Sequence, residues 1–260
     1  MFSIKLRKSL PAFLMALVGI VLTVSLSAAN SALLDRARSN GPQRTAPNSE
    51  TMHIAETAMD LQSTVIEIRV ADGADDAEED SSGRISPLSS DLELTFDLVK
   101  QIEQTVGIRF VGAAIPPGAT ITKAYIQFQT DEIAAEAAAL TIQGHATGNA
   151  PAISTATQDI SGRSRTVSAV PWNPDPWNTL GEAGPPQQTP DLKAVIQEII
   201  DQPGWLSGNA MAVIITGTGT RVAESFEGNP AAAPLLVVEY TIDSGPGNQA
   251  PTVNAGPDQT

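Results

Sequence analysis

The stretch TVGIRFVGAAIPPGATITKAYIQF (Thr105–Phe128) decides the fold class. Each half has apolar residues at a spacing close to two: Val106, Ile108 and Phe110, then Ile121, Ala124, Ile126 and Phe128. That spacing places them on one face of a β-strand. Between the halves, Pro117 presets its own φ and Gly118 can adopt a positive φ, which favours a turn. The stretch therefore predicts two half-buried strands separated by a turn.

The same pattern recurs along the chain. Short alternating runs lie at Ser63–Val70, Asp91–Phe96, Ala138–Ala146, Arg165–Trp172, Ala210–Gly217 and Pro234–Ile242. Together they give about eight strands separated by Gly, Pro and Asp turns, which favours an all-β antiparallel sandwich or barrel.

One segment, TPDLKAVIQEIIDQPGW (Thr189–Trp205), departs from the strand period. Its apolar residues recur at helical spacing: Leu192, Val195, Ile196, Ile199 and Ile200. We expect one amphipathic helix from Pro190 to about Gln202, with Thr189 as its N-cap and Pro203–Gly204 as its stop. This helix should close one side or end of the sandwich.

The N-terminus has the pattern of a secretory signal. Lys5, Arg7 and Lys8 precede an apolar run, and Ser27-Ala28-Ala29 supplies small residues at a cleavage site. We expect residues 1–29 to be a signal peptide cleaved after Ala29, with a retained membrane anchor as the alternative. Residues 30–60 then form a disordered leader, 61–243 one folded domain, and the mature protein is secreted or held at the cell surface.

The net negative charge of the chain makes some classes of binding partner unfavourable. The chain has a formal net charge of −14 and no cysteine, and removing residues 1–29 would take away three cations and no acid. Such a surface repels nucleic acid and anionic lipid, so neither nucleic acid nor, for the mature form, a membrane is expected as a partner. The lack of cysteine excludes thiol catalysis and thiolate metal sites.

The densest charge run, ADGADDAEED (Ala71–Asp80), suggests a cation site. Its carboxylates repel one another, so we expect a loop that is either solvated or neutralised by Ca²⁺, which takes oxygen ligands from irregular loops. The expected ligands are Asp75, Asp76, Glu78 and Glu79, with Asp91 or Glu93 contributing from the next strand. Smaller acidic groups lie at or near strand ends: Asp131, Glu132, Glu224 and Glu227, with Arg221 placed to pair with Glu224.

A long Pro/Gly-rich loop, Val170–Pro190, holds two of the three tryptophans. Trp172 and Trp177 could stack on the apolar faces of sugar rings if exposed, and we take them as the candidate ligand-binding residues. The alternative is that both indoles pin the loop onto the sandwich. Trp205 follows the helix directly and is expected in the core.

The order of these pieces resembles the DNRLRE-type jelly-roll modules, which are related to carbohydrate-binding modules. The likeness is carried by Arg109-Phe110, the turn Ile115–Ala119, Ala124, the helix Asp191–Ile200 and the strand Pro234–Tyr240. It implies an antiparallel jelly-roll β-sandwich. The tail NQAPTVNAGPDQT (Asn248–Thr260) resembles the first strand of PKD-type immunoglobulin-like domains, so residues 244–260 are expected to be a linker and the start of a truncated PKD-type domain, with further domains of that type downstream.

Three functions remain open. The first is a non-catalytic extracellular module that binds a polysaccharide or cell-surface glycan, or anchors the protein at a surface. The alternative is a calcium-stabilised structural or adhesive module without sugar specificity. The third is a polysaccharide-degrading domain using paired carboxylates; no catalytic motif supports it, and no cofactor other than Ca²⁺ is expected.

Overall fold

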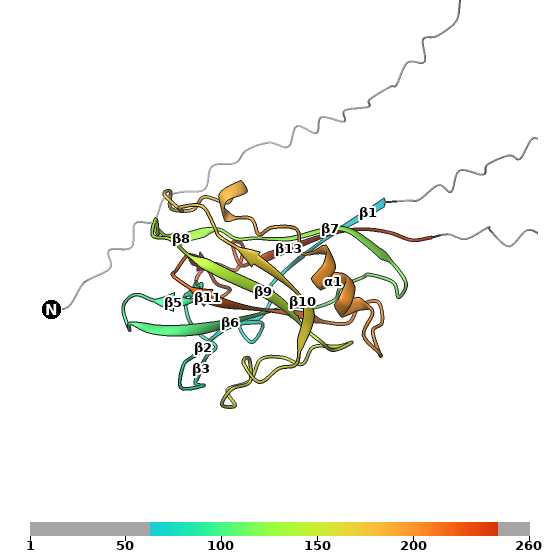
Figure 1. The fold of residues 1–260 in the computed structure, drawn as a ribbon, viewed down its shortest axis with the longest axis horizontal. Coiled ribbons are helices and arrows are strands. Elements are labelled where there is room, and N and C mark those ends of the chain that lie inside the picture. The colour runs from blue at the N-terminus through green and yellow to red at the C-terminus, as the bar shows by residue number, and fades with distance from the viewer. Residues whose placement is uncertain (1–62, 244–260) are drawn as a thin grey trace, which may run out of the picture. The chain divides into compact units, whose positions relative to one another are not determined.

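A computed structural model describes residues 63–243, which form an all-β sandwich (Figure 1). This range has thirteen strands, one α-helix and one 3-10 helix. The predicted fold class is therefore confirmed, although eight strands was an undercount. The segments expected to be a signal peptide, a leader and the start of a PKD-type domain lie outside the described residues.

Three antiparallel sheets make up the fold. One has the order β1 (Ser63–Arg69), β13 (Leu235–Thr241), β7 (Thr120–Gln127). The largest has the order β10 (Arg165–Trp172), β9 (Ala139–His145), β11 (Met211–Thr218), β6 (Ile102–Phe110), β2 (Asp76–Asp80), β3 (Ile85–Ser86), with β5 (Phe96–Asp97) also paired to β6. The third is short: β4 (Asp91–Glu93), β12 (Val222–Glu224), β8 (Thr130–Glu132).

The main core lies between the first two sheets. Val106, Ile108 and Phe110 of β6 pack in the same cluster as Leu236 and Val238 of β13, and all five are fully buried. The period-two pattern in the sequence predicted these inward positions because successive side chains of a strand point to opposite faces. In β1 and β13, Ser63 pairs with Thr241 and Arg69 with Leu235, so the first and last described strands run side by side.

The outer face of the largest sheet is also covered. Ala77 and Ile214 pack there against Ile153 and Ile160 from the segment that joins β9 to β10. Arg163 holds that segment together by donating to the carbonyls of Pro151, Ala152 and Asp159. Strand β11 in the middle of this sheet is therefore a continuous apolar run from Met211 to Ile215, as expected for a strand buried on both faces.

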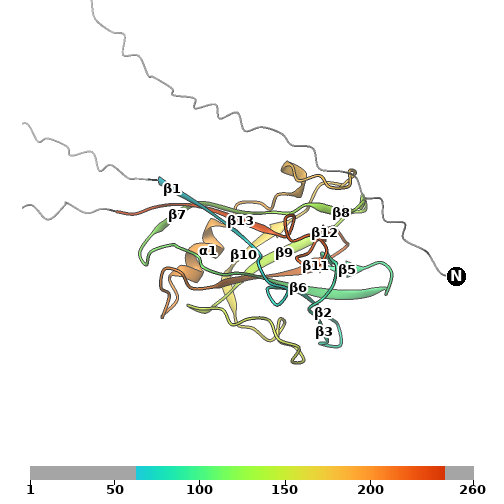
Figure 2. The same ribbon diagram turned by 180° about the vertical axis from the view of Figure 1, so that it is seen from behind.

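The α-helix, α1 (Lys193–Ile200), buries Val195, Ile196, Ile199 and Ile200 in the main core. It contacts β7, β9 and β10, and both views place it at the end of the sandwich between the two large sheets (Figures 1 and 2). The helical period predicted its buried face, but the helix is shorter than expected at both ends. The 3-10 helix η1 (Pro185–Gln187) lies in the preceding loop.

The residues predicted to start the helix instead bind the edge of β7. Thr189 Oγ1 accepts a hydrogen bond from the N–H of Ile126, and Asp191 Oδ1 accepts one from the N–H of Ala124. Thr189 is therefore not the N-cap, which is Leu192. An edge strand presents unpaired N–H groups, and these side chains satisfy them.

Candidate metal centre

The two tryptophans predicted to bind a ligand are buried. Trp172 is 4% exposed and Trp177 is fully buried. Phe128 stacks on Trp172 with ring centroids 5.8 Å apart, and the Trp177 indole N–H donates to the carbonyl of Pro186 at 2.9 Å. Both indoles pin the loop onto the sandwich, so the prediction that they border a sugar-binding surface is wrong.

The second half of the acidic run is a buried strand and not a solvated loop. Asp76–Asp80 forms β2, which lies between β6 and β3 in the largest sheet. Asp75, Asp76, Glu78 and Glu79 are each only 1–3% exposed. A buried carboxylate needs a hydrogen-bond donor, a cation or a proton, and each of these four side chains should have one.

Two of the four are satisfied within the protein. The Arg109 guanidinium donates to Asp75, and Arg109 also donates to the carbonyl of Ala150. Glu79 Oε2 accepts hydrogen bonds from the backbone N–H groups of Ile160 and Ser161, each at 2.8 Å. Asp75 and Glu79 therefore hold the covering segment and the adjacent strand in place. Within the part of the chain that the structure describes, neither belongs to a group of three acids close enough to share an ion, so their role as calcium ligands stays a prediction.

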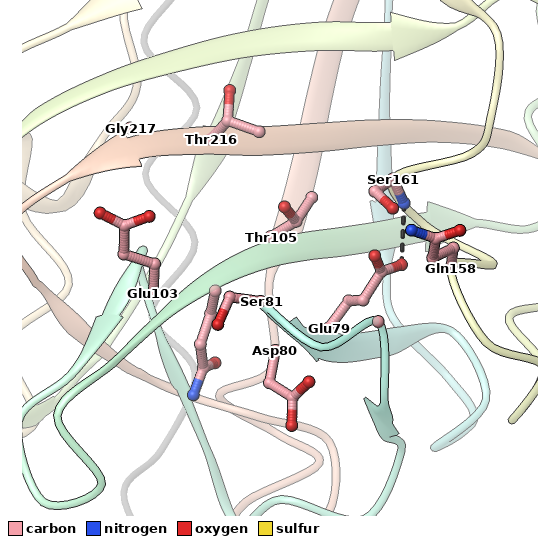
Figure 3. A pocket seen from close by; sticks show the side chains of 11 residues that line it. Glu79, Asp80, Ser81, Glu103, Thr105, Gln158, Ser161, Thr216 and Gly217 are labelled. Atoms are coloured by element: carbon pink, nitrogen blue, oxygen red, sulfur yellow. Dashed lines mark hydrogen bonds between the residues drawn. The ribbon is translucent and has the colours of Figure 1, made fainter.

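Figure 3 shows where Glu79 lies. It forms one wall of a hollow of about 260 Å³ between β2, β6 and β11, which Asp80, Glu103 and Gln158 also line. The Asp80 carboxylate is bound by the side chains of Ser82 and Arg84. The carboxylates of Glu79 and Asp80 thus serve local structure, and the hollow does not gather them around a common point.

Glu78 and Glu93 form a buried carboxyl pair. Glu78 Oε1 accepts the backbone N–H of Glu93 at 2.6 Å, and the Gln104 amide donates to both Glu78 oxygens at 3.1 and 3.3 Å when its nitrogen faces them. Burial, followed by the hydrogen bond to the Glu93 side chain, raises the pKa of Glu78 to about 10. Negative charge on Glu78 is therefore disfavoured when no cation is bound, and the role of Glu78 and Glu93 as calcium ligands stays a prediction.

The last predicted ligand, Asp91, belongs to another group of acids. Among residues 63–243, Asp91, Asp131 and Glu132 form the group of three whose carboxylate oxygens lie within 4.8 Å of one another. Ligands 2.3–2.6 Å from a calcium ion lie at most about 5 Å apart, so this spacing fits one ion. The three side chains are half-buried or exposed, which leaves room for water ligands.

The short third sheet brings these residues together. β12 lies between β4 and β8, so Asp91 and Glu224 are directly opposite, while Val222 is opposite both Glu93 and Glu132. Burial raises the pKa of Glu224, and the negative charges of Asp131 and Asp91 add to the effect. Like charges placed opposite one another destabilise a sheet, and a bound cation would reverse the sign of that interaction.

Arg221 does not neutralise this group. Its side chain is 1% exposed, and its guanidinium donates to the backbone carbonyls of Asp175, Glu136, Thr220 and Pro174. The predicted pairing of Arg221 with Glu224 is therefore wrong. Arg221 instead fastens the tryptophan loop to the end of β12.

The grouping of Asp91 with Asp131 and Glu132 was missed from the sequence. All three lie at or near a strand end, as predicted, but Asp91 is about forty residues from Asp131 and Glu132 and meets them only through the register of β4, β12 and β8. The sequence shows a carboxylate on each of three short strands. It does not show that these strands are neighbours, because their pairing joins distant parts of the chain.

Comparison of the chain with protein-family models gave no match, and a search of curated proteins gave none either. Between residues 63 and 243, no helix has both the length and the apolar character needed to cross a membrane.

Proposed function

We propose that residues 63–243 form a non-catalytic structural module of an exported protein, stabilised by a bound divalent cation, with calcium the best fit. The observation that carries this proposal is the convergence of Asp91, Asp131 and Glu132 within 4.8 Å. Hard oxygen ligands on short, irregular strands suit Ca²⁺, which accepts flexible geometry. Export is supported by the basic and then apolar pattern of residues 1–29.

The cation would stabilise the folded domain by neutralising the repulsion between neighbouring carboxylates of the third sheet. The Glu224 side chain lies opposite Asp91 and is acted on by the charges of Asp91 and Asp131. An ion bound to Asp91, Asp131 and Glu132 would join β4 to β8 across β12, so it would bind the folded state and not the unfolded chain. Carbohydrate binding was expected from exposed indoles, and the burial of Trp172 and Trp177 removes its support.

Thermal unfolding tests this function. The metal-free chain is melted with calcium chloride, with sodium chloride at equal ionic strength, and with a chelator. At a calcium concentration 100 times Kd, binding adds about 2.7 kcal/mol, which raises Tm by about 5–10 °C for a domain of this size. The rise should disappear in Asp131→Asn and persist in Glu67→Gln, which alters an exposed carboxylate on β1.

Equal effects of calcium and sodium would reject a bound ion and leave only an acidic surface. Binding to a glycan array by both the parent and a Trp177→Phe variant would reject a purely structural role.

A further inference from the structure

The outer face of the largest sheet changes from apolar to polar along its strands. Ala77 of β2 and Ile214 of β11 are buried there against the segment that joins β9 to β10. Two residues further along, on the same face, these strands carry Glu79 and Thr216, and Thr105 of β6 lies directly opposite Glu79. The hollow shown in Figure 3 therefore begins where the apolar cover of the sheet ends.

Glu79 presents a carboxylate oxygen that the protein does not use. The residue is 3% exposed, and both hydrogen bonds to its side chain, from the N–H groups of Ile160 and Ser161, go to Oε2. Its Oε1 accepts none from residues 63–243 and is not sealed inside the protein, so it opens into the hollow. Arg165, on which the charge of Glu79 acts, neither forms an ion pair with it nor lines the hollow. A buried carboxylate with a free oxygen favours a ligand that brings a positive charge and a hydrogen-bond donor.

A second carboxylate lies on the same face of the sheet. Glu103 is two residues before Thr105 on β6, so it is the diagonal neighbour of Glu79 across the two strands. The Cα atoms of diagonal neighbours are about 7–8 Å apart. Glu103 is exposed, and Figure 3 shows its carboxylate on the other side of Thr105 from Glu79. The two acids therefore mark the ends of an elongated site and do not converge on a single metal ion.

The rest of the lining supplies hydrogen-bonding groups without positive charge. Thr105, Thr216 and Ser161 contribute hydroxyl groups, and Gln158 contributes an amide. Gln158 has a φ of 64°, which non-glycine residues seldom adopt, and its N–H donates to the carbonyl of Gly83 at 2.8 Å. Neither lysine nor arginine is among the residues that line the hollow. The lining therefore disfavours anions and suits a ligand with several N–H donors.

We propose that this hollow binds a short linear diamine with both amino groups protonated. One ammonium group would donate to Glu79 Oε1 and the other to the Glu103 carboxylate, while the hydroxyl of Thr105 accepts a further N–H between them. The volume of about 260 Å³ is below the range of about 300–1,000 Å³ that is usual for drug-sized ligands, so a small molecule fits. The site is separate from the proposed calcium site and does not depend on it.

Titration of 1,4-diaminobutane into the metal-free, ¹⁵N-labelled chain tests the proposal by NMR. The amide signals of Ile160 and Ser161 should shift, because their N–H groups donate to Glu79. 1-Aminobutane should bind about tenfold more weakly, because it has one charge, and uncharged 1,4-butanediol should not bind. If the diamine leaves both amide signals in place, or if the diol binds as well as the diamine, the proposal is overturned.

Variants of the two acids locate the site. Glu79→Gln keeps an oxygen for the N–H groups that hold it and loses the charge, so affinity for the diamine should fall about tenfold or more. Glu103→Gln alters an exposed side chain, so the fold is retained and affinity should also fall about tenfold.

The control Glu67→Gln alters an exposed carboxylate on β1 and should bind the diamine as the parent does. Asp131→Asn, which removes a ligand of the proposed calcium site, should also bind it normally, so the two proposals fail independently. A far-UV circular dichroism spectrum checks that each variant is folded. Equal affinities of Glu103→Gln and Glu67→Gln would overturn the two-carboxylate site, whatever the behaviour of Glu79→Gln.

Discussion

The Glu198 carboxylate of α1 accepts a hydrogen bond from the backbone N–H of Val167, at 2.6 Å. Its other oxygen accepts the N–H of Ser168 at 2.8 Å. Both donors lie on β10, the edge strand of the largest sheet, at the point where its pairing with β9 is interrupted. On its other side, the Gln197 amide oxygen accepts the N–H of Ile121 on β7. The helix therefore satisfies edge strands of both large sheets.

Replacing Glu198 with alanine should lower the free energy of unfolding by about 1–3 kcal/mol, because two N–H groups lose a charged acceptor. Urea unfolding measures the change. Glu136→Ala, which removes an exposed side chain, should stay within about 0.5 kcal/mol of the parent. Equal stability of Glu198→Ala and the parent would mean that water replaces the carboxylate without cost.

Glu198 should also contribute to acid sensitivity. The N–H of Ser168 lowers its pKa, and together with Val167 it outweighs burial, which acts in the opposite direction. A lowered folded pKa means that the stabilisation is complete above the unfolded value of about 4.3 and is lost as pH falls through the folded value. Below about pH 4.3, the parent should therefore lose stability more steeply than Glu198→Gln. Parallel profiles for the two proteins would argue against this.

Trp177→Ala should destabilise the domain by about 3–5 kcal/mol, since it empties a fully buried site and frees the Pro186 carbonyl. Trp177→Phe should cost less because it keeps an aromatic ring beside Phe128 and Trp172. Thermal unfolding ranks the three proteins. A Trp177→Ala variant as stable as the parent would show that the loop is not pinned by this indole.

Arg221→Met should cost more than about 3 kcal/mol, although it retains much of the apolar side-chain volume. Four backbone carbonyls accept from this guanidinium, and each would be left without its donor. The matched control is Arg84→Met, because the Arg84 side chain is 75% exposed and its ion pair with Asp80 is worth little. Chemical denaturation of both variants should separate them clearly, and similar losses would contradict the role given to Arg221.

The sequence predicted the helix and strands in which the spacing of apolar residues shows which face is buried. The helical spacing of Val195, Ile196 and Ile199 predicted the buried face of α1, and alternation predicted the inward residues of β6. Strand β2 was missed because its buried side chains are acidic, and a local pattern reads acids as exposed. Its burial depends on Arg109 and on N–H groups of Ile160 and Ser161, which arrive from distant segments.

The candidate site was only partly predictable for the same reason. Asp76 and Asp91 were expected to share one ion, but the structure binds Asp76 to the N–H of Phe226 and places Asp91 with Asp131 and Glu132. Composition indicates an excess of carboxylates, whereas strand register decides which of them meet. The tryptophans show the converse: an aromatic residue in a polar, proline-rich loop looks exposed until Phe128 is placed beside it.

The pairing of Ser63 with Thr241 has a mechanical consequence. The first and last described strands are antiparallel neighbours whose outer ends coincide, so tension applied at residues 63 and 241 would separate β1 from β13 one hydrogen bond at a time. This is an unzipping geometry, in which the bonds are not loaded together as they are in shear. Under load, β1 should peel away first and lengthen the chain before the core between the two large sheets is disturbed.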